Sequence, residues 1–245
     1  NIKALKRIRR NIAAFGGNPR NVTITGESAG AHNVMNLVIS PLAKGLFHRA
    51  IAQSGYFGEN TLDLKNSAGL ARPSAHQQGV DAAKTLDIAG DDEKAIRELR
   101  GLSAEKLLTI PVSIGSLQSG SGRAFSFGPV VDGYVLPRDP GEVWAAGQMH
   151  DVPLIAGSLL DDGSVFSRNN PVKRLLGYRL TLNVIFGSEA KRALEMFPAG
   201  TDADVQPNIH RITTLICFRA PARRLVRAVD DAGGDGNDVF YRPSQ

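Results

Sequence analysis

The opening of the chain carries hydrophobic side chains at every third or fourth position, a spacing that predicts an amphipathic helix. The positions that form this pattern are Ile2, Leu5, Ile8, Ile12 and Phe15. Two glycines, an asparagine and a proline follow at residues 16–19, and this composition predicts a turn that ends the helix.

Two short runs rich in β-branched or apolar residues come next, with a second helical pattern between them. Residues 22–25 favour a buried strand, and residues 49–53 favour another. Between them, the apolar spacing from Ala29 to Val38 predicts a helix that Ser40 and Pro41 end. The order helix, strand, helix, strand is typical of a parallel sheet with crossover helices.

The pattern changes between about residues 57 and 125, which we interpret as a helical insertion. Helical spacing covers residues 78–86, 92–99 and 103–109, and a loop rich in Gly and Ser covers residues 113–123. We expect these residues to be inserted into a single domain that comprises the whole chain, residues 1–245.

The alternation of strands and helices returns after the insertion. We predict strands at residues 129–133 and 153–157, with a short helix at 142–148 between them. A long helical span at 204–229 and a strand at 238–241 complete the pattern. The predicted fold class is therefore α/β, with a mostly parallel sheet, crossover helices and helical insertions.

Composition excludes several classes of function. The single Cys rules out a disulfide framework and a multi-thiolate zinc site, so no metal is expected, and no apolar run approaches the length of a membrane-spanning helix. The net charge of +5 comes largely from basic clusters at residues 3–10 and 219–227, neither of which is interleaved with aromatic residues. We interpret both clusters as solvated helix faces, and expect no nucleic-acid partner.

The chemistry of the chain centres on residues 26–30, Gly-Glu-Ser-Ala-Gly, which match Gly-x-Ser-x-Gly between a predicted strand and a predicted helix. In a nucleophile elbow, the Ser lies on a strained strand-to-helix turn, and the glycines at its two sides avoid clashes. We therefore predict Ser28 as a nucleophile supported by Gly26 and Gly30. The backbone N–H of Ala29 is the predicted oxyanion donor.

Three blocks of sequence resemble the type-B carboxylesterase and cholinesterase family of α/β-hydrolases. They are NIAAFGGNPRNVTITGESAG, SPLAKGLFHRAIAQSG and FGPVVDGYVLP, in that order along the chain. The resemblance implies an α/β-hydrolase fold, no cofactor, and hydrolysis of small-molecule carboxylic esters by a Ser–Glu–His triad through an acyl-enzyme.

By the same resemblance, the acid of the triad falls in the stretch IAGSLLDDGSVF, where Asp162 takes the place of the family's Glu. Asp162 follows the predicted strand 153–157, at the end of a parallel strand where such sites form. Asp161 is the weaker alternative. The resemblance also implies that Ser54 donates a hydrogen bond to the acid, although a plain Ser at a strand end explains this residue nearly as well.

The histidine of the triad is harder to assign, because of the five histidines only His210 follows Asp162. The family's catalytic His follows a strand that resembles residues 239–241, so we expect it after Gln245 and keep His210 as the alternative. The family's Gly-rich oxyanion loop would likewise precede Asn1. The sequence is thus predicted to be the middle of an esterase, and its compartment stays open between cytoplasm and secretion or periplasm.

A second class of function is a non-catalytic, cholinesterase-like binding or adhesion module, or an inactive truncated hydrolase. Such modules usually lack the nucleophile, whereas Ser28 and its two glycines are present here. The intact motif favours the enzyme.

Overall fold

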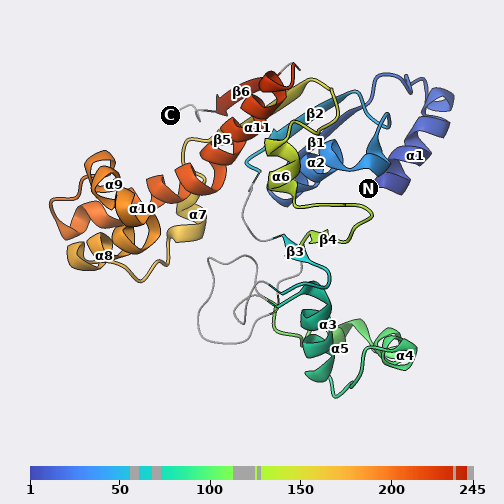
Figure 1. Ribbon diagram of the computed structural model, residues 1–245, viewed down its shortest axis with the longest axis horizontal. Helices are drawn as coiled ribbons and strands as arrows, with labels where there is room; N and C mark the ends of the chain where they lie inside the picture. The colour runs from blue at the N-terminus through green and yellow to red at the C-terminus, as the bar shows by residue number, and fades with distance from the viewer. Residues whose placement is uncertain (56–60, 68–72, 113–124, 126–127, 234–235, 242–245) are drawn as a thin grey trace. The chain divides into compact units, whose positions relative to one another are not determined.

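A computed structural model describes the chain except residues 56–60, 68–72, 113–124, 126–127, 234–235 and 242–245. The chain forms two compact units (Figure 1). One comprises Asn1–Phe57 and Val143–Gln245, and the other comprises Gly58–Glu142. The predicted Gly/Ser-rich loop at 113–123 lies outside the described residues, and the single domain with an insertion stays a prediction.

The first unit is the α/β unit. It contains, in chain order, α1 (Ile2–Asn11), η1 (Ile12–Phe15), β1 (Thr23–Glu27), α2 (Ala29–Ile39), η2 (Pro41–Ala43), β2 (Arg49–Gln53), β5 (Leu154–Leu159), α7 (Gly163–Ser167), α8 (Leu175–Phe186), η4 (Gly187–Glu189), α9 (Ala190–Met196), η5 (Asp202–Asp204), α10 (Val205–Thr214), the π-helical η6 (Leu215–Arg219), α11 (Ala220–Asp231) and β6 (Gly236–Tyr241). Helix α6 (Pro140–Ala145) contains the boundary between the two units.

Four strands of this unit form one parallel sheet in the order β1-β2-β5-β6. The register pairs Ala50 of β2 with Ile24 of β1 on one side and with Leu154 of β5 on the other. The prediction of a parallel sheet with crossover helices is therefore confirmed, because α2 joins β1 to β2 and the α7–α11 segment joins β5 to β6.

The predicted strand at 22–25 is displaced in the structure, where β1 covers Thr23–Glu27. The difference is tertiary in origin, since Gly26 and Glu27 pair with Ala52 and Gln53 of the neighbouring strand. A glycine that would weaken an isolated strand is thus held in the ladder by its partner.

The helices that connect the strands bury one face against the sheet. Helix α2 is packed on β1 and β2 and buries Val34, Met35 and Val38, each at most 3% exposed. Helix α11 is packed on β5 and β6 and buries Leu225 and Val229. Burial of each such side chain favours folding by about 1.5–3 kcal/mol.

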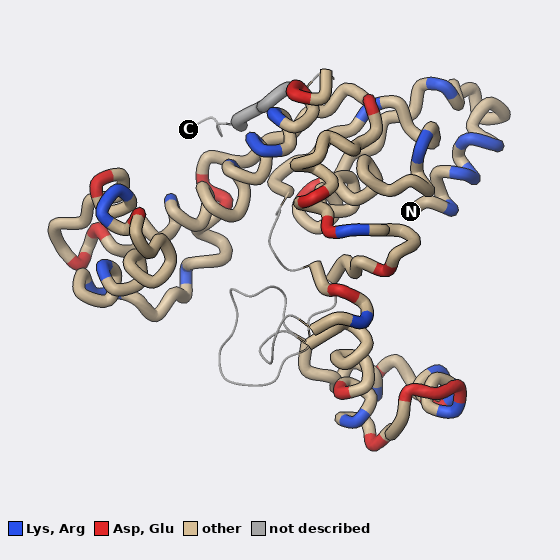
Figure 2. Tube along the Cα trace, in the orientation of Figure 1, with Lys and Arg blue, Asp and Glu red and all other residues tan. Residues whose placement is uncertain are grey.

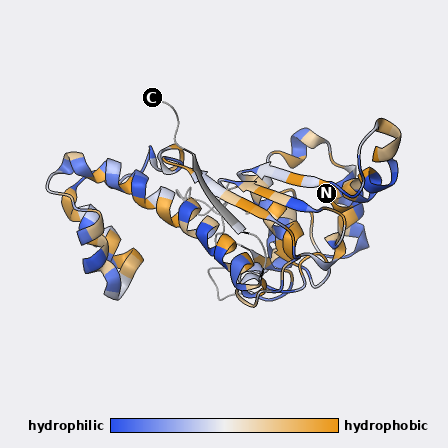
Figure 3. Ribbon diagram, turned by 90° about the horizontal axis from the view of Figure 1, so that it is seen from above, coloured by the Kyte–Doolittle hydropathy of each residue, from blue (hydrophilic) through white to orange (hydrophobic). Residues whose placement is uncertain are grey.

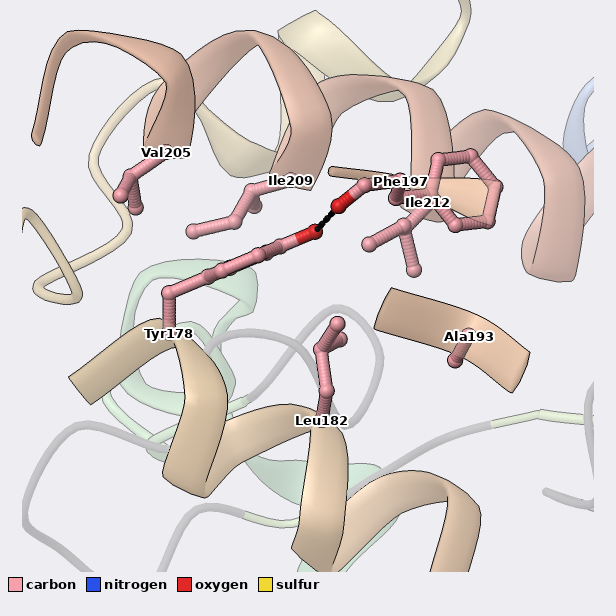
Figure 4. Close-up of a cluster of buried hydrophobic side chains, with 7 residues drawn as sticks. All are labelled: Tyr178, Leu182, Ala193, Phe197, Val205, Ile209 and Ile212. Atoms are coloured by element: carbon pink, nitrogen blue, oxygen red, sulfur yellow. Dashed lines mark hydrogen bonds between the residues drawn. The ribbon is translucent and has the colours of Figure 1, made fainter. Parts of the chain in front are cut away.

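A second group of buried side chains lies between α8, α9 and α10 (Figure 4). Its centre is Tyr178, whose ring is fully buried and whose hydroxyl donates a 2.7 Å hydrogen bond to the carbonyl oxygen of Phe197. The other members are Leu182, Ala193, Phe197 itself, Val205, Ile209 and Ile212. These contacts hold the segment between Asp162 and α11 in a folded arrangement.

The predicted long helix at 204–229 is interrupted by the π-helical turn Leu215–Arg219. Hydrophobic and hydrophilic residues alternate along the span (Figure 3). The interruption has a local cause, because Pro221 lacks an N–H and its ring crowds the carbonyl four residues earlier. The wider π-helical turn before the proline accommodates both the missing N–H and the crowded carbonyl.

The second unit contains β3 (Leu62–Asp63), α3 (Ala75–Lys84), α4 (Glu93–Gly101), α5 (Ala104–Leu107) and β4 (Val130–Val131). Its helices were predicted, and Ala83, Leu86, Ile88 and Ala95 form a small buried cluster. The prediction that residues 129–133 resume the main α/β alternation is wrong. β4 pairs with β3 instead, and β2 pairs directly with β5 in the main sheet.

The basic clusters lie on helices α1 and α11 and on the π turn before α11 (Figure 2). All of the Lys and Arg side chains of α1 are exposed, as are Arg223, Arg224 and Arg227, whereas Arg219 is half-buried. Within the described part of the chain, no helix combines the length and hydrophobicity that crossing a membrane requires.

Candidate active site

The candidate residues lie at the carboxyl edge of the parallel sheet. The register sets Glu27 beside Gln53 and sets Gln53 beside Gly157. Ser28 and Ser54 directly follow β1 and β2, and Asp162 comes three residues after β5. Because parallel strands end at a common edge, the sheet brings the nucleophile candidate and the acid candidate to the same side of the unit.

Ser28 occupies the turn between β1 and α2 in a backbone conformation that residues other than glycine rarely adopt. Its φ is 53° and its ψ is −116°, outside the ordinary regions for a residue with a Cβ. The turn is held from both sides, because the Ser28 N–H donates to the Gln53 carbonyl (2.9 Å) and the Ser28 carbonyl accepts from the His32 N–H (3.0 Å). This is the strained strand-to-helix geometry that a nucleophile elbow requires.

The two glycines of the motif differ in their surroundings. A Cβ at Gly26 would lie 2.3 Å from the carbonyl carbon and oxygen of Gly30 and 2.8 Å from the Ala31 nitrogen. A Cβ at Gly30 would meet no described atom within 4 Å. The expected clash is therefore present at Gly26 only, and Gly30 contributes the backbone that Gly26 approaches.

Ala29 is the first residue of α2, directly after Ser28. The N–H groups of a helix's first turn have no partner within the helix, and they carry a partial positive charge. The Ala29 N–H is thus available beside the Ser28 side chain, whereas the neighbouring Glu27 side chain is exposed.

Asp162 is buried, with 9% of its surface exposed, and its carboxylate is turned back toward the sheet. Oxygen Oδ2 accepts a 3.0 Å hydrogen bond from the Ser54 hydroxyl and a 2.8 Å hydrogen bond from the Leu159 N–H. The hydrogen bond between Ser54 and the acid candidate is therefore present. Ser54 itself has a positive φ of 49°, and its N–H donates to the Gly157 carbonyl at 2.7 Å.

Asp161, the alternative acid, lies in a different environment. Its side chain is exposed, and its Oδ1 accepts from the Ser164 N–H at 3.2 Å. It therefore caps the short helix α7, whereas Asp162 faces the sheet.

Two of the five histidines lie at the amino edge of the sheet, opposite to Ser28. The His48 Nδ1 accepts from the Val22 N–H at 3.2 Å, just before β1 and β2 begin. A ring nitrogen of His150 lies 2.8 Å from the Ser40 carbonyl, four residues before β5. Burial, opposed by this carbonyl, lowers the pKa of His150. His76 belongs to the second unit, where it lies 3.2 Å from Asp91.

The remaining histidines are on helices next to the candidate site. His32 lies on α2 one turn after Ser28, and burial lowers its pKa. His210 lies on α10, and its Nε2 is buried without a hydrogen-bond partner among the described residues. The structure shows no hydrogen bond from His210 to Asp162 or Ser28, so His210 stays only the alternative to a base from elsewhere in the protein.

The sequence did not point to Gly163 and Thr214, which contact each other at the turn that directly follows Asp162. The Thr214 hydroxyl accepts from the Gly163 N–H at 2.8 Å and donates to the His210 carbonyl at 3.0 Å. Nothing in the sequence near Thr214 indicates this contact, because the two residues are 51 positions apart. No group of three or more His, Cys, Asp or Glu side chains suited to a metal ion occurs within the described ranges.

A parallel sheet with a strained serine after one strand and a buried, hydrogen-bonded acid after another defines the α/β-hydrolase class. The profile of the carboxylesterase family matches residues 1–233, nearly the whole chain. The chain belongs to the carboxylesterase family.

Several characterised proteins are similar to this chain. Fumonisin B1 esterase of Sphingopyxis macrogoltabida is 35% identical over 211 residues, which cover 86% of this chain and 36% of that protein. Carboxylesterase 1C of Rattus norvegicus is 32% identical over 99% of this chain and 45% of its own length. Para-nitrobenzyl esterase of Bacillus subtilis (strain 168) is 30% identical over 88% of this chain and 41% of its own length. The chain thus spans less than half of the length of each of these relatives.

Proposed function

We propose that this chain contributes the nucleophile and the acid of a serine carboxylic ester hydrolase that acts through an acyl-enzyme. The observation that carries the proposal is the pairing of two features at one sheet edge. One is the positive-φ Ser28 on the elbow, and the other is the buried Asp162 carboxylate held by Ser54. Membership of the carboxylesterase family supports the same reaction class.

In the acylation step, the Ser28 hydroxyl oxygen attacks the carbonyl carbon of the ester, and its proton passes to a histidine. The carbonyl oxygen becomes an oxyanion, which the Ala29 N–H at the start of α2 stabilises by a hydrogen bond. The tetrahedral intermediate collapses, and the alcohol leaves with the proton from the histidine. Water then releases the acid from Ser28 by the reverse sequence.

Asp162 orients that histidine and stabilises its protonated form. Two hydrogen-bond donors, the Ser54 hydroxyl and the Leu159 N–H, converge on one oxygen of the carboxylate and fix its orientation. The second oxygen is then left to accept from the imidazole. The sequence prediction puts this histidine after β6, where a loop would arrive at the same sheet edge, and His210 is the alternative.

The proposed substrates are small-molecule carboxylic esters. The named relatives include a fumonisin B1 esterase, a para-nitrobenzyl esterase and carboxylesterases, which supports this class without selecting one ester. A short-chain chromogenic ester is therefore the appropriate first substrate.

The test is covalent labelling of the complete protein with a fluorophosphonate. We expect stoichiometric labelling of Ser28, located by peptide mass spectrometry, together with turnover of the chromogenic ester. Ser28→Ala should abolish labelling and reduce turnover by at least about 10⁴, because the nucleophile is removed. Ester turnover that survives this change would refute the assignment.

A folded wild-type protein that takes up no label and turns over no ester would favour the non-catalytic binding module. In that comparison, a cooperative thermal unfolding transition of the wild-type protein shows that it is folded, and the same transition in Ser28→Ala shows that the variant is folded as well. Replacing His210 by Gln tests the alternative base, because the substitution should leave turnover unchanged if the histidine comes from elsewhere.

A further inference from the structure

In the turn after Asp162, the residue at the N-cap position of the following helix does not cap that helix with its side chain. Asp162 occupies the N-cap position of α7, where an Asp side chain ordinarily accepts hydrogen bonds from the backbone N–H groups of the first helical turn. Here its side chain makes no capping hydrogen bond, because the carboxylate is turned back to Ser54 and the Leu159 N–H.

The first two N–H groups of α7 are satisfied by residues other than Asp162. The Ser164 N–H donates to Asp161 Oδ1 at 3.2 Å, and the Gly163 N–H donates to the Thr214 hydroxyl at 2.8 Å. Thr214 is 2% exposed and belongs to the end of α10, directly before the π-helical turn. Its own hydroxyl proton goes to the His210 carbonyl at 3.0 Å, so both of its hydrogen-bonding functions are used.

The backbones of α7 and α10 approach closely at this contact. A Cβ at Gly163 would lie 2.2 Å from the His210 carbonyl oxygen and 2.7 Å from the Thr214 hydroxyl oxygen. Only a glycine brings its N–H this near to α10. The turn is also packed through the rings of Phe166 and Phe218, whose centroids are 5.6 Å apart.

We propose that Thr214 is a positioning residue that fixes the direction of the Asp162 carboxylate. This inference rests on the proposed function of Asp162 as the acid. By accepting from the Gly163 N–H, the Thr214 hydroxyl ties the residue next to Asp162 to the end of α10 and so fixes the backbone that carries the carboxylate. The carboxylate then stays on Ser54 and faces the sheet edge. Without the hydroxyl, the buried Gly163 N–H loses its acceptor, the turn shifts, and the carboxylate is displaced from Ser54.

The test replaces Thr214 in the complete protein by Val, which keeps the shape and removes the hydroxyl, and by Ser, which keeps the hydroxyl. We expect Thr214→Val to lower kcat for a chromogenic ester roughly ten- to a hundredfold with little change in KM. Thr214→Ser should stay within about threefold of the wild type. Thr181→Val is the matched control, because Thr181 donates the same kind of bond to the Gly177 carbonyl on α8.

A double-mutant cycle separates positioning from general destabilisation. If Thr214 acts through Asp162, Thr214→Val has no further effect on kcat once Asp162 is already Asn. An equal loss of kcat in both backgrounds, or an equal loss in the Val and Ser variants, would overturn the proposal. Fluorophosphonate labelling of the wild type tests the proposed esterase function independently. A failure of that function can therefore be distinguished from a failure of the positioning role of Thr214.

The crystal structure of Thr214→Val provides a readout that does not depend on turnover. We expect the turn at Gly163 to have shifted away from α10 and the Asp162 carboxylate to lie beyond hydrogen-bonding distance of the Ser54 hydroxyl. A carboxylate that stays on Ser54 in this variant would refute the positioning role whether or not the protein is an esterase.

Discussion

At the scale of single residues, the two adjacent aspartates show how environment separates like side chains. Asp162 is buried and accepts from Ser54 and the Leu159 N–H, whereas Asp161 is exposed and accepts from the Ser164 N–H. Burial with fixed donors suits the role proposed for Asp162, which is to orient a histidine. A helix cap requires only an accepting oxygen.

Asn substitutions at these two positions should therefore have very different effects. We expect Asp162→Asn to lower kcat for a chromogenic ester by about 10⁴, because the neutral amide neither orients nor stabilises the protonated histidine. Asp161→Asn should change kcat by less than about threefold, since Asn caps a helix nearly as well as Asp. Steady-state kinetics of the two purified variants measures both effects on kcat. A larger loss in Asp161→Asn than in Asp162→Asn would assign the role of the acid to Asp161.

At the scale of elements, the elbow depends on how closely β1 and α2 approach each other. Gly26 lies against the backbone of Gly30 and Ala31, which cannot rotate away as a side chain would. The positive φ of Ser28, which costs about 1–3 kcal/mol, is maintained by this contact and by the hydrogen bonds to Gln53 and His32.

Alanine at the two glycines should change the stability of the protein in opposite directions. Gly26→Ala should lower the free energy of unfolding by about 1–3 kcal/mol, because the new methyl group forces β1 and α2 apart. Gly30→Ala should raise it by up to about 1 kcal/mol, because the methyl group meets open space and alanine favours the helix. Urea unfolding followed by circular dichroism measures both, and a shift of the same sign would contradict the steric account.

At the scale of the whole molecule, two half-buried histidines couple stability to pH. Burial lowers the pKa of both His32 and His150 in the folded protein. The Lys44 charge lowers the pKa of His150 further, and the Ser40 carbonyl opposes both effects. Below about pH 6.5, the unfolded chain therefore binds more protons at these positions than the folded protein does.

The free energy of unfolding should accordingly decrease as the pH falls from 7.5 to 5.5, a range above the ordinary titration of carboxylates. His150→Gln should make this dependence shallower, because one of the two histidines no longer titrates. Urea unfolding at a series of pH values measures the slope. An unchanged slope in the variant, or greater stability at the lower pH, would refute the coupling.

The sequence by itself determined the elements nearest the nucleophile. The apolar spacing, the β-branched run and the Gly-Glu-Ser-Ala-Gly motif predicted β1, the elbow and α2 within two residues of their observed ends. It also predicted β2 at the observed residues 49–53. These features are local, because hydrophobic period, turn residues and helix-ending residues act over a few positions along the chain.

Only the tertiary structure decided how distant residues meet. Residues 130–131 favour a strand, but their pairing with β3 instead of the main sheet depends on a partner elsewhere in the chain. The turn after Asp162 likewise depends on Thr214, which comes from a different helix. A hydrogen bond between residues 51 positions apart has no local pattern, since folding alone brings the donor and the acceptor together.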